Sequence, residues 1–104
     1  MKPIVSKKLR DSARGKACTL RADCCSDNGL NVMLCHVPLK GMAGTGQKAH
    51  DIHAFYGCMA CHYYVDNEHR GDDSICVDVL RAVFETQSIM YEEGLIKVVG
   101  DKNK

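Results

Sequence analysis

Seven cysteines are the side chains of this 104-residue chain best suited to bind a metal ion. Two of them form a CMAC turn, Cys58-x2-Cys61, which places both thiolates on one side of a single ion. Structural zinc sites take four tetrahedral ligands, usually delivered as two close pairs from distant parts of the chain. Cys18 with either Cys24 or Cys25 supplies the second pair. The spacing therefore predicts a structural Zn²⁺ site that joins two remote turns.

The cysteines could also serve in packing or in redox chemistry. Cys35 falls in an expected strand and Cys76 near an expected helix start, each without a near partner, so both are interpreted as packing residues. Buried packing without any metal is the alternative for the four remaining positions. Redox chemistry at the CMAC turn would need a thioredoxin-like βαβ setting, and the sequence before Cys58 has no such pattern.

Two histidines near these turns add a second kind of chemistry. His62 directly follows the CMAC turn and Asp66 lies four residues on, so on a helix the two share one face and can hold one cation jointly. His36 ends an expected strand, and a zinc site that gathers the strands and the helix would place it opposite His62. A neutral imidazole takes a proton from water near physiological pH, and a divalent metal stabilises charge on a phosphate. This set predicts metal-assisted hydrolysis.

Each histidine also has an ordinary structural interpretation. His62 could pack beside the zinc turn, and His36 could bond a backbone group at the end of its strand. His50 and His53 are alternatives as phosphate or metal contacts, whereas His69 is interpreted as a solvated loop residue. These alternatives stay open at the level of residue types and spacing.

Composition and charge limit the class of protein. The length suits one domain, and with 6% aromatic residues and no Trp its core alone gives limited stability, which favours a metal staple. Net charge is +1, but seven basic residues from Lys2 to Arg21 stand against a single acid, Asp11. This asymmetry suits nucleic-acid contact, and equally a solubilising tail. We expect a basic N-terminal tail over residues 1–16 and a single zinc-binding domain over residues 17–104.

The expected location follows from the N-terminus and the cysteines. The segment MKPIVSKKLR is polar and basic, unlike a secretory signal, and no run approaches the ~18 apolar residues of a membrane span. We therefore expect a cytoplasmic protein, in which thiols stay reduced and cysteine clusters bind metal. The odd number of cysteines also argues against complete disulfide pairing.

The elements that must position these residues can be read from hydrophobic patterning. The sequence predicts a short helical turn near 7–13, strands at 30–37 and 51–57, a short helix at 59–66, a long helix at 74–93 and an extended segment at 95–99. Ser74 is the expected N-cap of the long helix and Gly94 its C-terminal stop. Residues 41–47 (GMAGTGQ) form a glycine-rich loop that matches neither a Walker A motif nor a dinucleotide fingerprint.

The order of these features resembles a known family. A strand ending in His, a glycine-bearing loop, an Asp, a second strand and CxxCH are together similar to HNH (ββα-metal) endonucleases on a treble-clef zinc frame. The span AC(x6)C…LCHVPLKGMAGTG…HDI…CMACHYYVD more specifically resembles the YbcO-like nucleases of lambdoid phages and prophages. The segment QSIMYEEGLIK is also similar, so the resemblance covers most of the chain. It implies an α+β fold, a small zinc-stapled treble-clef/ββα-metal domain with a long C-terminal helix.

The resemblance also implies roles for individual residues. It matches Cys25, rather than its neighbour, as the zinc ligand that accompanies Cys18. His36 falls at the general-base position and His62 at the catalytic-metal position. Asp51 falls where the central Asn of the family name sits, and Asp66 where some HNH enzymes have a second His.

The implied activity is metal-dependent hydrolysis of DNA in phage or prophage DNA processing, with Mg²⁺ or Mn²⁺ as the catalytic ion and Zn²⁺ as the structural one. DNA would meet the basic N-terminal residues and the ββα element. The sequence departs from the family at Cys35, where many HNH enzymes have a metal-binding Asp or His, because a thiol suits Mg²⁺ poorly. A non-catalytic zinc module that binds DNA or a protein partner is the alternative. The long C-terminal helix is a candidate homodimer face.

Overall fold

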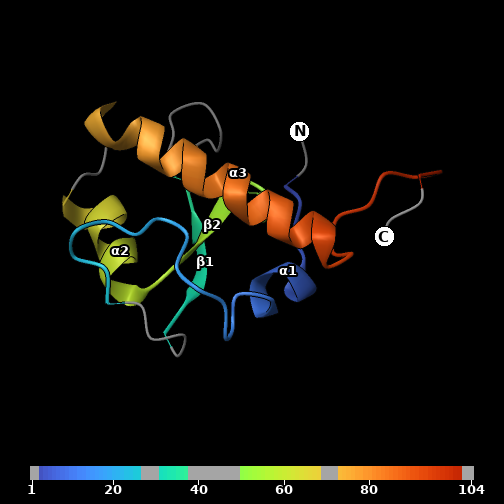
Figure 1. The fold of residues 1–104 in the computed structure, drawn as a ribbon, viewed down its shortest axis with the longest axis horizontal. Coiled ribbons are helices and arrows are strands. Elements are labelled where there is room, and N and C mark those ends of the chain that lie inside the picture. The colour runs from blue at the N-terminus through green and yellow to red at the C-terminus, as the bar shows by residue number, and fades with distance from the viewer. Residues whose placement is uncertain (1–2, 27–30, 38–49, 69–72, 102–104) are drawn as a thin grey trace.

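The computed structural model describes residues 3–26, 31–37, 50–68 and 73–101, which form a small α+β domain (Figure 1). In chain order the elements are α1 (Lys7–Asp11), β1 (Met33–His36), β2 (Ala54–Gly57), α2 (Met59–Tyr63), the π-helix η1 (Tyr64–Glu68), the 3₁₀ turn η2 (Asp73–Ile75) and α3 (Cys76–Glu92). The predicted α+β class and long C-terminal helix are confirmed. The predicted glycine-rich loop, His69 and Arg70 lie outside the described residues.

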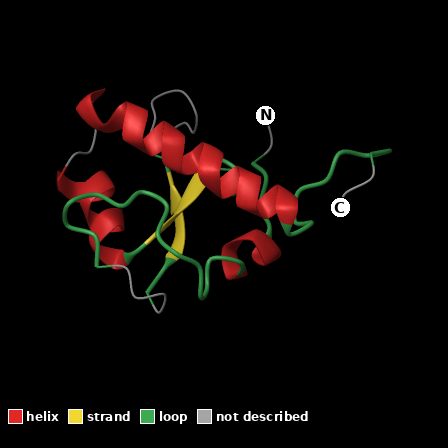
Figure 2. Ribbon diagram, in the orientation of Figure 1, coloured by secondary structure: helices red, strands yellow, loops and turns green. Residues whose placement is uncertain are grey.

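The two strands form an antiparallel hairpin beneath α3 (Figure 2). Cys35 pairs with Phe55, and His36 pairs with Ala54. Because side chains alternate along a strand, Cys35 and His36 project from opposite faces of the sheet. The second strand begins later than predicted because residues 50–53 form a turn, closed by a 3.1 Å bond from the His53 N–H to the His50 carbonyl.

Helix α3 provides the largest packing surface of the domain. Its predicted end is confirmed: Gly94 has φ +78°, its N–H bonds the Tyr91 carbonyl at 3.1 Å, and the Leu95 N–H bonds the Met90 carbonyl at 2.8 Å. This is a Schellman ending, which a residue with a Cβ adopts only with strain. The predicted Ser74 cap is wrong, because the chain enters α3 through the η2 turn and Ile75 occupies the cap position without a side-chain bond.

The predicted extended segment at 95–99 is also wrong, since these residues lie in turns and irregular backbone after α3. The Leu95 and Ile96 N–H groups both donate to the Met90 carbonyl, at 2.8 and 3.3 Å. This geometry turns the chain back on the end of the helix. Leu95 and Ile96 then pack against the hydrophobic core as partly buried side chains.

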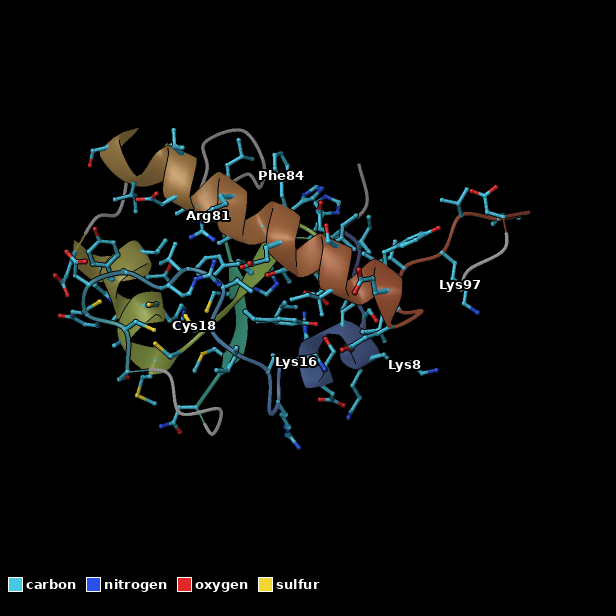
Figure 3. The ribbon with its side chains drawn as sticks, in the orientation of Figure 1. Lys8, Lys16, Cys18, Arg81, Phe84 and Lys97 are labelled. Carbon is cyan, nitrogen blue, oxygen red and sulfur yellow. The ribbon has the colours of Figure 1, made fainter. Side chains whose placement is uncertain are left out.

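A buried hydroxyl pair ties three distant segments together. Thr86 of α3 accepts a bond from the Tyr56 N–H at 3.1 Å, and its hydroxyl lies 2.9 Å from that of Thr19. The Arg81 guanidinium donates to the carbonyls of Thr19 and Leu20, at 3.0 and 2.9 Å. Figure 3 shows Arg81 on the edge of α3 that faces Cys18. Helix α3 and β2 therefore fix the loop that carries the first predicted zinc ligands.

The N-terminal segment packs against the sheet. The predicted short helix is confirmed as α1, capped by the Ser6 hydroxyl, which accepts the Leu9 N–H at 3.2 Å. Leu9 and Ala13 are buried, and α1 contacts β1. The Ser12 hydroxyl lies 2.7 Å from that of Tyr56. The division of the chain at residue 17 stays a prediction, but residues 3–16 contribute to the same core.

The predicted short helix after the CMAC turn is present in two parts. Helix α2 covers Met59–Tyr63 and continues directly into the π-helix η1, so the predicted range 59–66 is helical throughout. Val65 of η1 is buried, which anchors this extension against the core. None of the helices among the described residues has the length and apolar character needed to cross a membrane.

Candidate functional site

Four thiols converge at one end of the hairpin. The sulfurs of Cys18, Cys25, Cys58 and Cys61 all lie within 4.8 Å of one another. A tetrahedral ion with metal–sulfur bonds of about 2.3 Å requires sulfur–sulfur distances of roughly 3.8 Å. The Cys25 and Cys58 sulfurs are 3.8 Å apart. The donor set and its spacing therefore fit a metal ion such as zinc with little movement.

Local backbone structure positions each pair of thiols. Cys58 is the N-cap of α2, and its sulfur accepts the Cys61 N–H at 3.4 Å, so the CMAC turn aims both sulfurs the same way. In the other turn the Cys25 N–H bonds the Ala22 carbonyl at 2.8 Å. Cys24 points away, because its exposed thiol donates to the Ala60 carbonyl at 3.7 Å. The sulfur that lies with those of Cys18, Cys58 and Cys61 is therefore that of Cys25, and Cys24 stays outside the cluster.

The surroundings of the cluster favour a thiolate at one position. Burial opposes ionisation of Cys58, but the N–H groups of Cys61 and Ser26 and the neighbouring thiols outweigh it and lower the pKa of Cys58 to about 6. Burial raises the pKa of Cys61. The surroundings of Cys58 therefore favour its thiolate, which is the form that binds metal.

A second constellation lies at the other end of β1. The His36 Nε2 is 2.7 Å from Oδ1 of Asp51, whose side chain is completely buried. The other carboxylate oxygen accepts the Ser6 N–H at 2.7 Å and Nε of Arg10 at 3.0 Å. The Asp51 N–H in turn donates to the Ile4 carbonyl at 2.8 Å. The N-terminal segment thus encloses Asp51 and holds it against His36.

These bonds fix the ionisation of Asp51 and the tautomer of His36. Burial alone would raise the pKa of Asp51, but the Ser6 N–H, the His36 ring and Arg10 outweigh it and hold that pKa below its ordinary value. An ionised carboxylate can only accept hydrogen bonds, so the His36 Nε2 that faces it carries a proton. The Nδ1 atom of a neutral His36 is then the nitrogen able to accept a proton. The His36 side chain is one-third exposed, at 33%.

The third pair lies on α2 and η1. The His62 Nε2 is 2.7 Å from Oδ2 of Asp66, and the two side chains are 37% and 30% exposed. The predicted i, i+4 geometry is therefore present and accessible to a cation. Burial raises the pKa of Cys35 to about 12, and the charge of Asp66 adds to this rise.

Cys35 itself has the surroundings of a packing residue. It is 1% exposed, and its thiol lies 3.8 Å from the Gly57 carbonyl and 3.6 Å from that of Met33. With its pKa near 12 the thiol is neutral at physiological pH. In the described parts of the chain, the four cysteines are the one group of three or more potential metal ligands that lie close enough to share an ion.

His50 contacts the N-terminal segment, and the ring of His53 lies next to that of His50. His50 is buried, and its Nδ1 accepts the Ile4 N–H at 3.0 Å. The ring centroid of His53 lies 4.9 Å from that of His50, and the buried His53 Nδ1 has no hydrogen-bond partner among the described residues.

The sequence analysis did not identify Ser6 and Arg10 as neighbours of Asp51. Arg10 was visible only as one member of a basic run, so no local signal singled it out.

Comparisons with known proteins agree with this architecture. A sequence model of the family described as "Putative nuclease YbcO" matches residues 7–95. Two similar proteins, "Putative nuclease YbcO" of Escherichia coli (strain K12) and "Putative nuclease ybcO" of Enterobacteria phage 82, are each 37% identical over 92 residues, which is 86% of this chain and 96% of theirs. A solved structure, "Structure of a putative bacteriophage protein from Escherichia coli str. K-12 substr. MG1655", has a TM-score of 0.65 at 30% identity and covers 84% of this chain and 100% of its own.

Proposed function

This chain belongs to the YbcO family, and from that premise we propose that it is a metal-dependent endonuclease acting on DNA. The family match spans residues 7–95, and two relatives are 37% identical over almost their whole length. The names of the relatives support nuclease activity in general. The mechanism we propose is of the HNH type. It is supported by the order β1, β2, α2, in which His36 ends the first strand and His62 lies on the helix.

The structural part of the proposal is a Zn²⁺ ion held by Cys18, Cys25, Cys58 and Cys61. These four sulfurs join the loop after α1 to the start of α2, as a treble-clef frame requires. With the ion in place, the loop that carries Cys18 and Cys25 could not separate from α2. The ion has no role in the chemical step, since four thiolates leave no open position for water or substrate.

The observation that carries the chemical proposal is the 2.7 Å bond between His36 and the buried Asp51. Asp51 holds Nε2 in its protonated form, so Nδ1 is the atom that takes a proton from the attacking water. Arg10 and the Ser6 N–H keep Asp51 ionised and immobile. Asp51 is thus a positioning residue, which corresponds to the hydrogen-bonding role of the family's central Asn.

His62 and Asp66 are the residues we assign to a catalytic divalent ion. One imidazole and one carboxylate suit Mn²⁺, and also Mg²⁺, which keeps several waters and uses phosphate oxygens as further ligands. When bound, such an ion supplies electrostatic stabilisation of the pentacovalent phosphate and the leaving oxygen. In the protein itself, His62 Nε2 and Asp66 Oδ2 lie at a hydrogen-bond distance of 2.7 Å, so an ion bound by both side chains would replace the proton between them.

DNA would approach from the side of α1. The exposed side chains of Lys8, Arg10 and Arg14 lie on or just after this helix, next to the residues that hold Asp51. Phosphate contacts from such residues bring affinity without sequence preference, and the affinity falls as the salt concentration rises. Two neighbouring lysines are paired with acids, Lys7 with Asp11 at 2.6 Å and Lys16 with Glu93 at 2.9 Å.

Plasmid nicking in the presence of Mg²⁺ or Mn²⁺ tests the proposal. Wild-type protein with zinc bound should convert supercoiled to open-circular DNA, and His36→Ala should reduce the rate by roughly 10²–10⁴-fold, as expected for a lost general base. His62→Ala should raise the divalent-ion concentration needed for activity. Val99→Ala, at a 99% exposed site, serves as the control. Undiminished nicking by well-folded His36→Ala would contradict the mechanism.

One observation favours a second candidate function. Cys35 stands where many HNH enzymes have a metal ligand, and its neutral, buried thiol offers none. A zinc module that binds DNA without cleaving it is consistent with that loss. Wild-type protein that shifts DNA in a gel, yet cleaves neither duplex nor single strands with any of Mg²⁺, Mn²⁺, Co²⁺ or Zn²⁺, would establish this alternative.

A further inference from the structure

Helix α3 carries an apolar stripe that the domain leaves uncovered. Val77, Leu80, Phe84 and Tyr91 are 79%, 51%, 57% and 38% exposed, although the opposite side of the helix is buried in the core. Their spacing of three, four and seven residues is the a and d pattern of a heptad, with Gln87 at the missing position. A sustained pattern of this kind is typical of a helix that packs against another helix.

A shallow pocket lies within this stripe. It is lined by Phe84, Gln87, Ser88, Tyr91 and Glu92. The first four stand at positions i, i+3, i+4 and i+7, which is the set of four side chains that forms a hole for one side chain of a facing helix. A leucine is the residue that commonly fills such a hole.

We propose that the α3 stripe binds the α3 stripe of a second copy of this chain in an antiparallel pair, with the two-fold axis at Phe84. Leu80 precedes Phe84 by four residues and Ser88 follows it by four, so each Leu80 meets the pocket beside Ser88 of the other copy. Val77 and Tyr91 are each seven residues from Phe84 and also meet across the axis. Phe84 stacks on its counterpart.

The chemistry of the stripe favours a protein partner over nucleic acid or lipid. Val77, Leu80, Phe84 and Tyr91 carry no charge, and acids flank them at Asp78, Glu85 and Glu92. Glu85 is paired with Arg21 at 2.9 Å, but the carboxylates of Asp78 and Glu92 would repel phosphate backbones and anionic membranes. Figure 3 shows Phe84 on the edge of α3 away from Arg81 and the cysteine loop, so pairing here leaves the metal cluster undisturbed.

The stripe selects a copy of the same chain because the hole and the leucine that fits it lie on one helix, related by a two-fold rotation. Such an isologous contact closes on itself and gives dimers without further growth. The four exposed side chains offer roughly 400–500 Å² per copy, below the ~800 Å² of a standard interface, so a dissociation constant in the micromolar range is expected.

Sedimentation equilibrium of the zinc-loaded full chain tests the pairing. Wild type should shift from monomer to dimer between about 1 and 300 µM, and Leu80→Lys or Ser88→Glu should each weaken association by tenfold or more, about 1.4 kcal/mol. The double variant should regain dimerisation, because the introduced lysine and glutamate face each other across the two-fold axis. Within one helix they are eight residues apart, too far to pair. Val98→Glu, at a 53% exposed site outside α3, is the matched control.

Each result of the sedimentation experiment either supports or overturns part of the proposal. Weakening by both single substitutions with recovery in the double variant supports the antiparallel arrangement. A wild type that stays monomeric at 300 µM, or single substitutions with no effect, overturns the dimer. A double variant that remains monomeric overturns the proposed register. Unfolding curves matched to wild type show that each variant is folded, and none of these readouts depends on nuclease activity.

Discussion

The four-cysteine cluster and the His36–Asp51 pair are held in place by different kinds of interaction. The cluster is formed by four side chains of one type, whose sulfurs lie within 4.8 Å. The pair depends instead on a relay of hydrogen bonds, in which residues 4–10 of the N-terminal segment close over Asp51. In our proposal the first region is stabilised by bonds to a shared ion, whereas the second is held by the docking of a peptide segment.

This difference affects what each region can tolerate. A ligand lost from a structural zinc site removes binding energy that the small core cannot replace. A donor lost from the Asp51 relay should lower stability only slightly, and should chiefly change the position and ionisation of Asp51 and His36. We therefore expect substitutions in the cluster to act on folding, and substitutions in the relay to act on chemistry.

Substitution of a cluster residue should have the largest effect. Cys58→Ser removes a thiol whose pKa is lowered to about 6, while the serine hydroxyl can still cap α2, so the variant tests loss of the metal ligand alone. Structural zinc contributes about 10–16 kcal/mol of apparent binding free energy in zinc-finger peptides, so the variant should be largely unfolded at 25 °C. Circular dichroism and zinc content by mass spectrometry measure the two consequences.

Cys24→Ser is the matched control for that experiment. Cys24 neighbours Cys25 in sequence, but its exposed thiol contacts only the Ala60 carbonyl among the bonds of the described residues. This variant should bind one equivalent of zinc and melt within a few degrees of wild type. Zinc loss from Cys24→Ser but not from a Cys25→Ser protein would reverse the assignment of the ligands.

The difference between the cysteine cluster and the Asp51 relay also determines how much of each region the sequence predicts. The CMAC turn and Cys18 could be paired from spacing, because the ligands of one ion share a residue type and need only be brought together. The choice of Cys25 over Cys24 needed either a family resemblance or coordinates. The two residues are both cysteines, and they differ only in the direction in which their side chains point. The helix end at Gly94 was also readable, because few residues adopt its positive φ.

The relay around Asp51 was only half predictable. His36 and Asp51 could be named as a pair through the resemblance, but their partners Ser6 and Arg10 lie 45 and 41 residues away from Asp51. Nothing local distinguishes Arg10 from the other basic residues near it. The prediction of a Ser74 cap also failed, because residues 73–75 form a 3₁₀ turn that ends at the buried Ile75 and α3 begins only after it.

Substitution of Arg10 should have an intermediate effect, confined to the relay. Arg10 donates to Asp51 through Nε, its side chain is 46% exposed, and its terminal amino groups have no hydrogen-bond partner in the described parts of the chain. These groups can bind a DNA phosphate beside His36. Arg10→Gln should lower kcat roughly tenfold and reduce the slope of log affinity against log salt by about one.

Arg14→Gln provides the matched comparison, because it removes the same charge from an exposed side chain that does not contact Asp51. It should reduce the salt slope to a similar extent and leave kcat at saturating DNA unchanged. Equal kcat values for the two variants would mean that Arg10 contributes only charge. Fluorescence anisotropy with labelled DNA gives the binding data even if cleavage is absent.

The smallest expected effect concerns the pH dependence of stability. Ionisation of Asp51 should make the free energy of unfolding fall as the pH is lowered. Its pKa is lower in the folded protein than the ordinary value near 4, so its bonds stabilise the fold fully above that value. The contribution is lost as pH falls through the folded-state pKa. Urea unfolding at pH 3 to 6 should show a steeper fall in the free energy of unfolding for wild type than for Asp51→Asn, which cannot ionise.

Protonation of the cysteines and release of zinc affect both proteins alike, so the difference between the two curves reports on Asp51 alone. Parallel curves would mean that the N-terminal segment is held by packing of Leu9 and Ala13, and that the charge of Asp51 serves His36 alone.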